Sequence, residues 1–169
     1  MTILNDIATI LHEDFKCDKL QFEEKDAGMK IDVDSSGCQC IVYKYDKKLG
    51  REYKGGLFPF FAKNEGVCKV SDYIVFAEYK RTLYCLIIEL KKGKSQTFPQ
   101  LLAAKDFVKY IVSTLNRVTK KAYTPEIRLI SIHGINLRKK KTAITEVQYD
   151  QNSHCVVKSN LFKVKLYLT

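Results

Sequence analysis

Residues 71–94 of the chain, SDYIVFAEYKRTLYCLIIELKKGK, decide its fold. Two runs rich in β-branched and aromatic residues, 71–77 and 83–90, are each long enough for a β-strand. The polar stretch between them, residues 78–82, is short enough for a tight connection. The pattern therefore predicts an antiparallel hairpin whose second strand ends in a charged segment.

The charged residues of this hairpin indicate what it does. A turn centred between Lys80 and Arg81 places Asp72 directly across from Glu89. Side chains two residues apart on a strand share a face, so Lys91 joins the same patch. Two opposed carboxylates repel each other, and a divalent cation between them relieves that repulsion most simply. The three residues together predict a cation-dependent site.

Another interpretation of the same residues needs no chemistry. Glu89 and Lys91 can simply mark the point at which a buried strand emerges into solvent, because short motifs of this kind often occur by chance. A register slip of one residue would also turn Asp72 to the other face of the sheet. The pairing of the two strands therefore decides how the motif is interpreted.

The rest of the chain alternates helical and strand patterns. We expect an amphipathic first helix over residues 2–15, a hairpin from Met29 to Tyr45 and a long helix from about Pro99 to Lys120. Further strands are expected at Glu126 to His133, near Ile144 to Tyr149, at His154 to Lys158 and at Phe162 to Leu168. This order implies an α/β fold, a mixed sheet flanked by helices. The 169 residues fit a single domain spanning residues 1–169.

Composition favours a soluble globular protein of the cytoplasm, without a membrane partner. Hydrophobic residues make up 46% of the chain and charged residues 28%, which is not the balance of a disordered chain. Apolar runs are shorter than the roughly 18 residues of a spanning helix. Asn5 and Asp6 interrupt the N-terminal segment where a signal peptide is apolar. The chain can build its own core and shows no secretion signal, so we expect the six cysteines to be reduced rather than in disulfides. They form no C-x-x-C pair, so we expect no zinc site.

The charge balance points to polyanionic partners. Twenty-nine Lys and Arg against nineteen Asp and Glu leave a net charge of +10, which favours nucleic acid through counterion release. An anionic membrane surface or solubility alone would account for the same number. We expect nucleic-acid contacts from Lys92 and Lys94, after the apolar strand, and from Lys105 on the long helix. The run LFPFF at 57–61 is either a loop packed on the core or an exposed patch for a protein partner.

The order of these features resembles the PD-(D/E)XK nuclease superfamily, which has the restriction-endonuclease-like fold. The features are an acidic residue early in one strand, a hairpin, an apolar strand that ends in Glu-x-Lys, and a following helix. The resemblance covers about residues 65–121. It implies that Asp72 and Glu89 are metal-binding carboxylates. It also implies that the backbone carbonyl of Leu90 is a further metal ligand and that Lys91 is the catalytic lysine.

The resemblance implies two residues outside this motif. Many members carry another acidic residue on a helix before the sheet; Glu13 is the best match here and Glu24 the second. Gln100, near the start of the long helix, resembles a polar residue that often faces the site in relatives. Two positions depart from the pattern, because Ser71 replaces the proline of the motif and Ala104 stands where one large branch has tyrosine.

The function implied by this resemblance is hydrolysis of phosphodiester bonds by a nuclease that uses Mg²⁺ or Mn²⁺. DNA is expected as substrate ahead of RNA, with restriction or phage defence as the setting. A homodimer or a larger defence complex is expected, since one site cuts one strand. Two alternatives stay open: a non-catalytic nucleic-acid-binding or assembly subunit on the same fold, and a protein-protein or small-molecule module in which the charge only maintains solubility.

Overall fold

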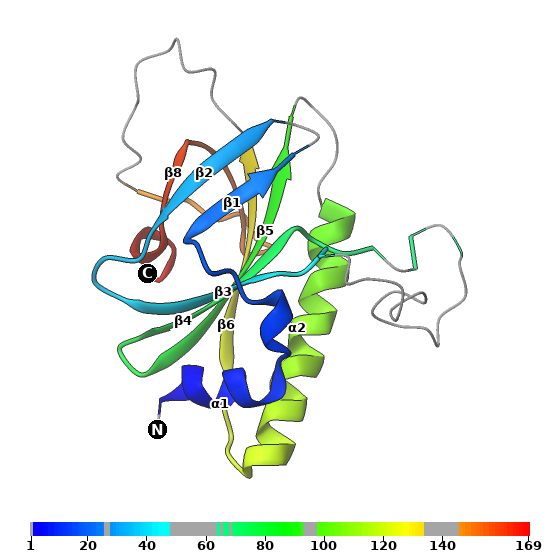
Figure 1. Ribbon diagram of the computed structural model, residues 1–169, viewed down its shortest axis with the longest axis vertical. Coiled ribbons are helices and arrows are strands. Elements are labelled where there is room, and N and C mark those ends of the chain that lie inside the picture. Colours follow the sequence, from blue (N-terminus) through cyan, green and yellow to red (C-terminus); the bar gives the residue numbers. More distant parts are fainter. Residues whose placement is uncertain are drawn as a thin grey trace.

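A five-stranded mixed sheet forms the centre of the molecule, with strand order β3-β4-β5-β6-β7 (Figure 1). Its strands are β3 (Gln39–Lys44), β4 (Tyr73–Tyr79), β5 (Thr82–Lys91), β6 (Pro125–His133) and β7 (His154–Lys158). The pairs β3/β4 and β4/β5 are antiparallel, and the pairs β5/β6 and β6/β7 are parallel. This computed structural model describes residues 2–25, 28–47, 64, 66–67, 69–92, 98–133 and 146–169.

Both faces of the central sheet are covered, which explains why β4 and β5 are almost continuously apolar. On one face, α1 (Ile3–Ile10) and α2 (Phe98–Thr119) form a core with the sheet. On the other face lies a three-stranded sheet of order β1-β2-β8, formed by β1 (Gln21–Glu24), β2 (Met29–Asp34) and β8 (Leu161–Lys163). Alternate residues of β4 and β5 therefore enter two different cores.

The predicted hairpin and its register are confirmed. Pairing runs from Tyr79 with Thr82 to Tyr73 with Ile88, and one further step in this register sets Asp72 across from Glu89. The turn residues Lys80 and Arg81 both have positive φ, 50° and 65°. Positive φ at both central positions is typical of the type I′ turn, whose twist suits a two-residue hairpin even when neither residue is glycine.

A second predicted hairpin, from Met29 to Tyr45, is wrong. The strand β2 pairs with β1 and β8 instead, whereas β3 pairs with β4. The apolar alternation of β2 is satisfied because Ile31 and Val33 pack with Phe22 in the core between the two sheets. The turn after Asp34 therefore carries the chain from one sheet to the other.

Both ends of the chain also differ from the sequence prediction. The first helix stops at Ile10, because Leu11 is extended with φ −102° and ψ 137°, and a short 3₁₀ helix follows at Glu13–Phe15. At the other end, the strand stops at Lys163 and Val164–Tyr167 forms a 3₁₀ helix. Residues 146–149 are not a strand, and β1 was not predicted. The sequence predictions for residues 57–61 and for Lys94 lie outside the described residues.

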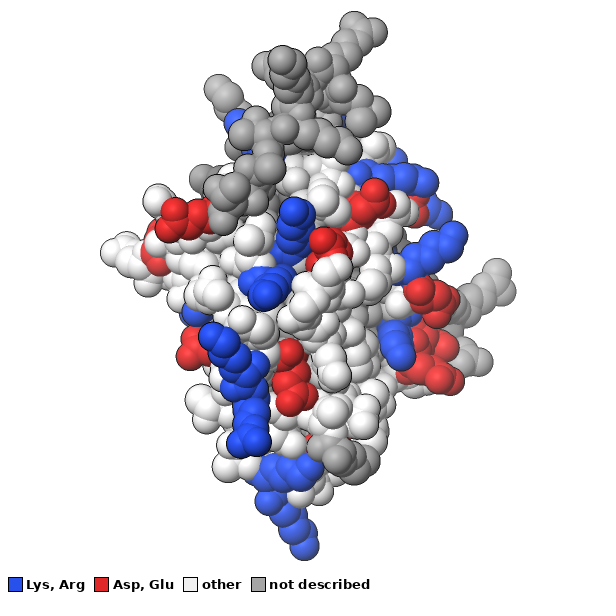
Figure 2. Space-filling view, turned by 90° about the vertical axis from the view of Figure 1, so that its left-hand side faces the viewer, with Lys and Arg blue, Asp and Glu red and all other residues white. Residues whose placement is uncertain are grey.

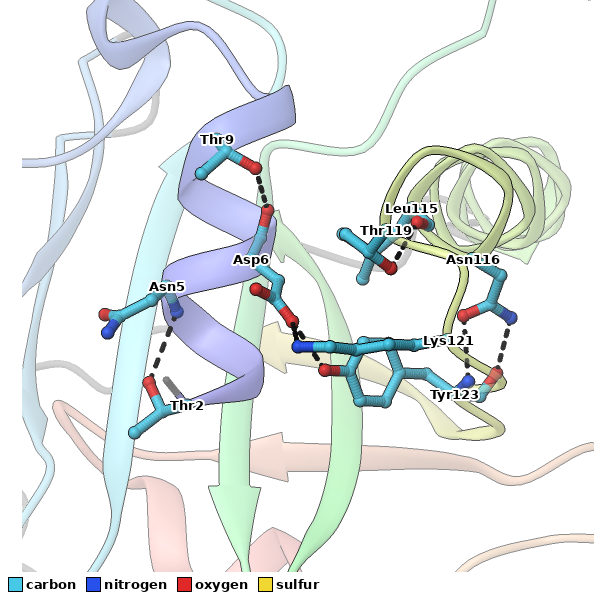
Figure 3. A network of polar contacts seen from close by, with 9 residues as sticks. All are labelled: Thr2, Asn5, Asp6, Thr9, Leu115, Asn116, Thr119, Lys121 and Tyr123. Carbon is cyan, nitrogen blue, oxygen red and sulfur yellow. Dashed lines mark hydrogen bonds and ion pairs between the residues drawn. The ribbon is translucent and has the colours of Figure 1, made fainter.

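A buried carboxylate joins the two helices (Figure 3). Asp6 on α1 is 4% exposed, and its Oδ2 accepts hydrogen bonds from Lys121 Nζ at 2.6 Å and from the Tyr123 hydroxyl at 2.5 Å. Hydrogen bonds from Lys121 and Tyr123 hold the pKa of Asp6 below its usual range. Tyr123 is fixed in turn by a pair of hydrogen bonds with the side chain of Asn116. This network anchors α1 to the C-terminal end of α2.

Within the described part of the chain, no helix has the length and apolar character needed to cross a membrane. Charges of both signs lie on the face drawn in Figure 2, where Asp and Glu side chains stand between those of Lys and Arg. The excess of positive charge is therefore not expressed there as a uniformly basic surface.

Candidate metal-dependent active site

The predicted motif residues meet where β5 ends. Asp72 directly precedes β4, and its Oδ2 accepts a 2.6 Å hydrogen bond from the backbone N–H of Leu90. Glu89 is only 3% exposed, and its Oε1 lies 3.2 Å from Lys91 Nζ. The side chain of Lys91 is 23% exposed, so its ammonium links the buried carboxylate to the surface. The hairpin register thus brings Asp72, Glu89 and Lys91 together.

Burial raises the pKa of both motif carboxyls. For Glu89, burial is the main cause and the charge of Asp72 the second, which together raise the pKa to about 7 against the opposing effect of Lys91. For Asp72, burial is again the main cause, and its pKa rises to about 6 although the Leu90 N–H lowers it. The charges of Asp46 and Glu24 raise the pKa of Asp72 further. Both carboxyls therefore hold their protons to a higher pH than they would in water.

Three carboxylates form a cluster at this end of the sheet. One oxygen each from Glu24, Asp46 and Asp72 lie within 4.8 Å of one another. Glu24 ends β1 in the three-stranded sheet, whereas Asp46 follows β3 in the central sheet. Glu13, in contrast, is an exposed residue of the short 3₁₀ helix and is not part of this cluster. The structure thus places the second acidic candidate, rather than the first, beside Asp72.

Asp46 escaped the sequence prediction because β3 was assigned to the wrong partner. In the structure, β3 pairs with β4, and the Tyr45 N–H donates a 2.9 Å hydrogen bond to the Asp72 carbonyl. The residue after Tyr45 therefore lies beside Asp72. The available signal was an aspartate directly after a strand, but it became informative only once that strand was paired with β4.

The donor set suits a hard divalent cation. Carboxylate oxygens are the ligands that Mg²⁺ and Mn²⁺ prefer. Within the described residues, Glu89 Oε2 is buried and has no hydrogen-bond partner, and a buried carboxylate oxygen left in this state is costly unless a cation satisfies it. Glu24, Asp46 and Asp72 are thus the residues whose oxygens lie close enough together to hold such an ion, and Glu89 adds a buried oxygen without a partner across from Asp72. A role for the Leu90 carbonyl stays a prediction.

The other predicted residues surround this site to different degrees. Gln100 lies in the first turn of α2, half-buried, and its Oε1 has no hydrogen-bond partner among the described residues. Lys92 is exposed directly after β5. Lys105 lies on α2 and is half-buried. Contacts of either lysine with nucleic acid stay predictions.

A second polar set, which the sequence prediction missed, lies on the neighbouring strands. Ser131 Oγ is 2.9 Å from His154 Nε2, and His154 Nδ1 is 3.7 Å from Asp150 Oδ2. Ser131 is 1% exposed and stands next to Glu89 in the β5/β6 ladder. Because the hydroxyl is closed off from solvent, we interpret this set as a link between β6 and β7. No local sequence pattern predicts these contacts, since the three residues come from separate segments.

No protein-family model, curated protein or solved structure matches this chain.

Proposed function

We propose that the chain is a metal-dependent nuclease with a restriction-endonuclease-like core, which hydrolyses phosphodiester bonds in nucleic acid, in DNA ahead of RNA. The observation that carries this proposal is the meeting of Asp72, Glu89 and Lys91 at the end of one hairpin. In this arrangement Asp72 is also part of a cluster of three carboxylates. A buried acidic site beside an accessible lysine suits a cation and a phosphate together.

Each residue has a distinct task in this mechanism. Asp72 and Glu89 would hold Mg²⁺ or Mn²⁺, with Glu24 and Asp46 as further oxygen donors. The cation supplies Lewis-acid chemistry, which activates water and offsets charge on the phosphate. Lys91, held by Glu89 at 3.2 Å, would orient the attacking water and stabilise the added negative charge on the phosphate oxygens.

The Leu90 N–H supports this assignment. Its hydrogen bond fixes one oxygen of Asp72, which leaves the other oxygen to bind a cation. The net charge of +10 fits a polyanionic substrate. Cleavage of both strands of a duplex would need two such sites, so we further propose a homodimer or a larger complex, as in restriction or phage defence.

A non-catalytic nucleic-acid-binding subunit on the same fold is the second candidate. It is favoured by the ion pair of Lys91 with Glu89, which neutralises part of the acidic charge without any metal. In that case the basic residues would bind nucleic acid, and the acidic cluster would have no reaction to perform.

The test is cleavage of plasmid, single-stranded DNA and RNA in the presence of Mg²⁺, Mn²⁺ or EDTA. Glu89→Gln removes the buried charge at constant shape, and Glu126→Gln is the matched control, because Glu126 is half-exposed at the opposite end of the parallel ladder. We expect metal-dependent cutting that Glu89→Gln abolishes and Glu126→Gln retains. If the folded wild-type protein binds nucleic acid but cuts none of these substrates, the binding-subunit interpretation is favoured.

A further inference from the structure

The hydroxyl of Tyr73 connects the two sheets beside the acidic cluster. It accepts a hydrogen bond from the Glu23 N–H at 2.7 Å and donates one to the Glu23 carbonyl at 3.0 Å. Tyr73 begins β4 of the central sheet, whereas Glu23 lies in β1 of the three-stranded sheet. The Tyr73 ring packs on Phe22 with ring centroids 4.8 Å apart. Ring packing and hydroxyl bonding are therefore separable functions of one side chain.

A lysine holds the same peptide from a third strand. Lys44, at the end of β3, donates a hydrogen bond from Nζ to the Glu23 carbonyl at 3.2 Å. The same Nζ lies 3.8 Å from Asp46 Oδ1 and 5.3 Å from the centre of the Tyr73 ring. We refer to Glu23, Lys44 and Tyr73 as the Glu23 clamp. Through it, both β3 and β4 hold the end of β1.

The residue after the clamp is a member of the acidic cluster. Glu24 is the last residue of β1, and its carboxylate meets Asp46 and Asp72, which lie just outside the strands β3 and β4 of the other sheet. Among the strands that the structure describes, none of the central sheet pairs with β1. The clamp therefore supplies specific polar bonds that fix where the end of β1 lies relative to Asp72.

The cluster has independent support as a cation site. Glu89 is 97% buried, it stands across from Asp72 in the hairpin register, and its Oε2 has no hydrogen-bond partner among the described residues. A buried oxygen with this need points to a ligand beyond the hydrogen bonds of the cluster itself.

We propose that Tyr73 and Lys44 are positioning residues for the cation site, which they complete by holding Glu24 beside Asp72. This inference rests on the cation site of the proposed function. Outer partners that orient a ligand typically change metal affinity 10- to 100-fold when removed. Lys44 has a second effect, because its ammonium offsets repulsion among the carboxylates when no cation is bound.

The experiment is a double-mutant cycle on Mn²⁺ affinity, measured by titration calorimetry with the full chain. Tyr73→Phe keeps the ring and removes the hydroxyl, and Glu24→Gln removes the ligand charge. We expect Tyr73→Phe to weaken Mn²⁺ binding about 10-fold in the wild-type background and to have no further effect beside Glu24→Gln. Tyr149→Phe is the control, since it also removes a tyrosine hydroxyl that donates to a backbone carbonyl, that of Tyr167 at 3.2 Å, and should leave the affinity unchanged.

Lys44→Met gives an independent check if Tyr73→Phe disturbs folding. Loss of a positive charge alone would tighten Mn²⁺ binding, whereas loss of a positioning residue weakens it, so the sign distinguishes the two effects. Equal losses from Tyr73→Phe with and without Glu24, or unchanged affinity, would overturn this inference and leave the nuclease proposal standing. A wild-type protein that binds no Mn²⁺ would overturn both.

Discussion

The backbone N–H of Leu90 donates a 2.6 Å hydrogen bond to the Asp72 side chain. This bond ties a carboxylate at the start of one strand to the end of the next, one residue beyond Glu89. A carboxylate held by a backbone N–H does not depend on a flexible side-chain partner for its position. The position of Asp72 relative to Glu89 is thus fixed within the hairpin itself.

Stability should fall as pH rises when no metal is bound. Burial, with the charge of Asp72, raises the pKa of Glu89 from 4.5 to about 7, and burial raises that of Asp72 to about 6. Between about pH 4 and pH 7 the folded state therefore binds more protons than the unfolded state, so the free energy of unfolding decreases with pH. Glu89 and Asp72 together account for a decrease on the order of a few kcal/mol.

Urea unfolding in EDTA at pH 5 and pH 8 measures this effect. The wild-type protein should be more stable at pH 5, and Glu89→Gln should reduce the difference between the two pH values. An identical pH dependence in wild type and variant would show that Glu89 titrates normally in the folded protein.

A bound cation should reverse that loss at high pH. At pH 8 Asp72, whose pKa burial raises to about 6, is charged, so Mg²⁺ at about 100 times its Kd should stabilise the fold by about 2.7 kcal/mol. For a chain of this size, this gain corresponds to a rise in Tm of about 5–10 °C. Differential scanning calorimetry with Mg²⁺ against EDTA tests it, with Asp72→Asn expected to abolish the shift.

The control for this measurement is Asp106→Asn, which removes an exposed carboxylate of α2 that pairs with Lys109. Asp106→Asn should keep the full shift. A shift that survives Asp72→Asn would place the ion elsewhere on the protein.

Substitutions in the type I′ turn of the hairpin should stabilise the folded protein. Lys80 and Arg81 both adopt positive φ, which costs a residue with a Cβ roughly 1–2 kcal/mol. Asn and Gly tolerate this conformation, so Lys80→Asn with Arg81→Gly should raise the free energy of unfolding by about 1 kcal/mol. Tm should then rise by about 2–4 °C.

The matched control removes the same two charges without helping the turn. Lys80→Ala with Arg81→Ala should give no gain in Tm. If both double variants stabilise the protein equally, relief of charge repulsion rather than turn geometry explains the change.

Lys92 should contribute to nucleic-acid affinity, because it is exposed directly after the strand that ends in the motif. Lys92→Ala should weaken binding to a labelled DNA duplex and lower the slope of log affinity against log salt by about 1. Fluorescence anisotropy in EDTA separates binding from cleavage. Lys80→Ala, in the turn that precedes β5, is the control. Equal losses from both variants would mean that net charge alone drives binding.

The sequence was sufficient for those parts of the fold that depend on neighbouring residues. The hairpin with Asp72 across from Glu89 follows from a short turn between two strands, and α2 follows from its apolar spacing. The pairing of β3 was missed, because Met29 to Tyr45 shows the same alternation whether it forms one hairpin or serves two sheets. In the structure β2 packs with Phe22 and Phe162 in the core between the two sheets, and the alternation within residues 29–45 does not encode these contacts.

The same limit applies to the site. Asp72, Glu89 and Lys91 share one hairpin, so one turn predicts their proximity. Glu24 and Asp46 reach the cluster only through contacts between segments distant in the sequence.

Glu24 ends a strand of one sheet, and Asp72 directly precedes a strand of the other. A cation bound by both residues would therefore be released when the two sheets separate. Partial opening of β1 and β2 would then cost the binding free energy of the cation in addition to the apolar contacts that are lost. The amide protons of β1 would exchange with solvent more slowly in the loaded protein. Occupancy of the site would thus convert two packed layers into one cooperative unfolding unit.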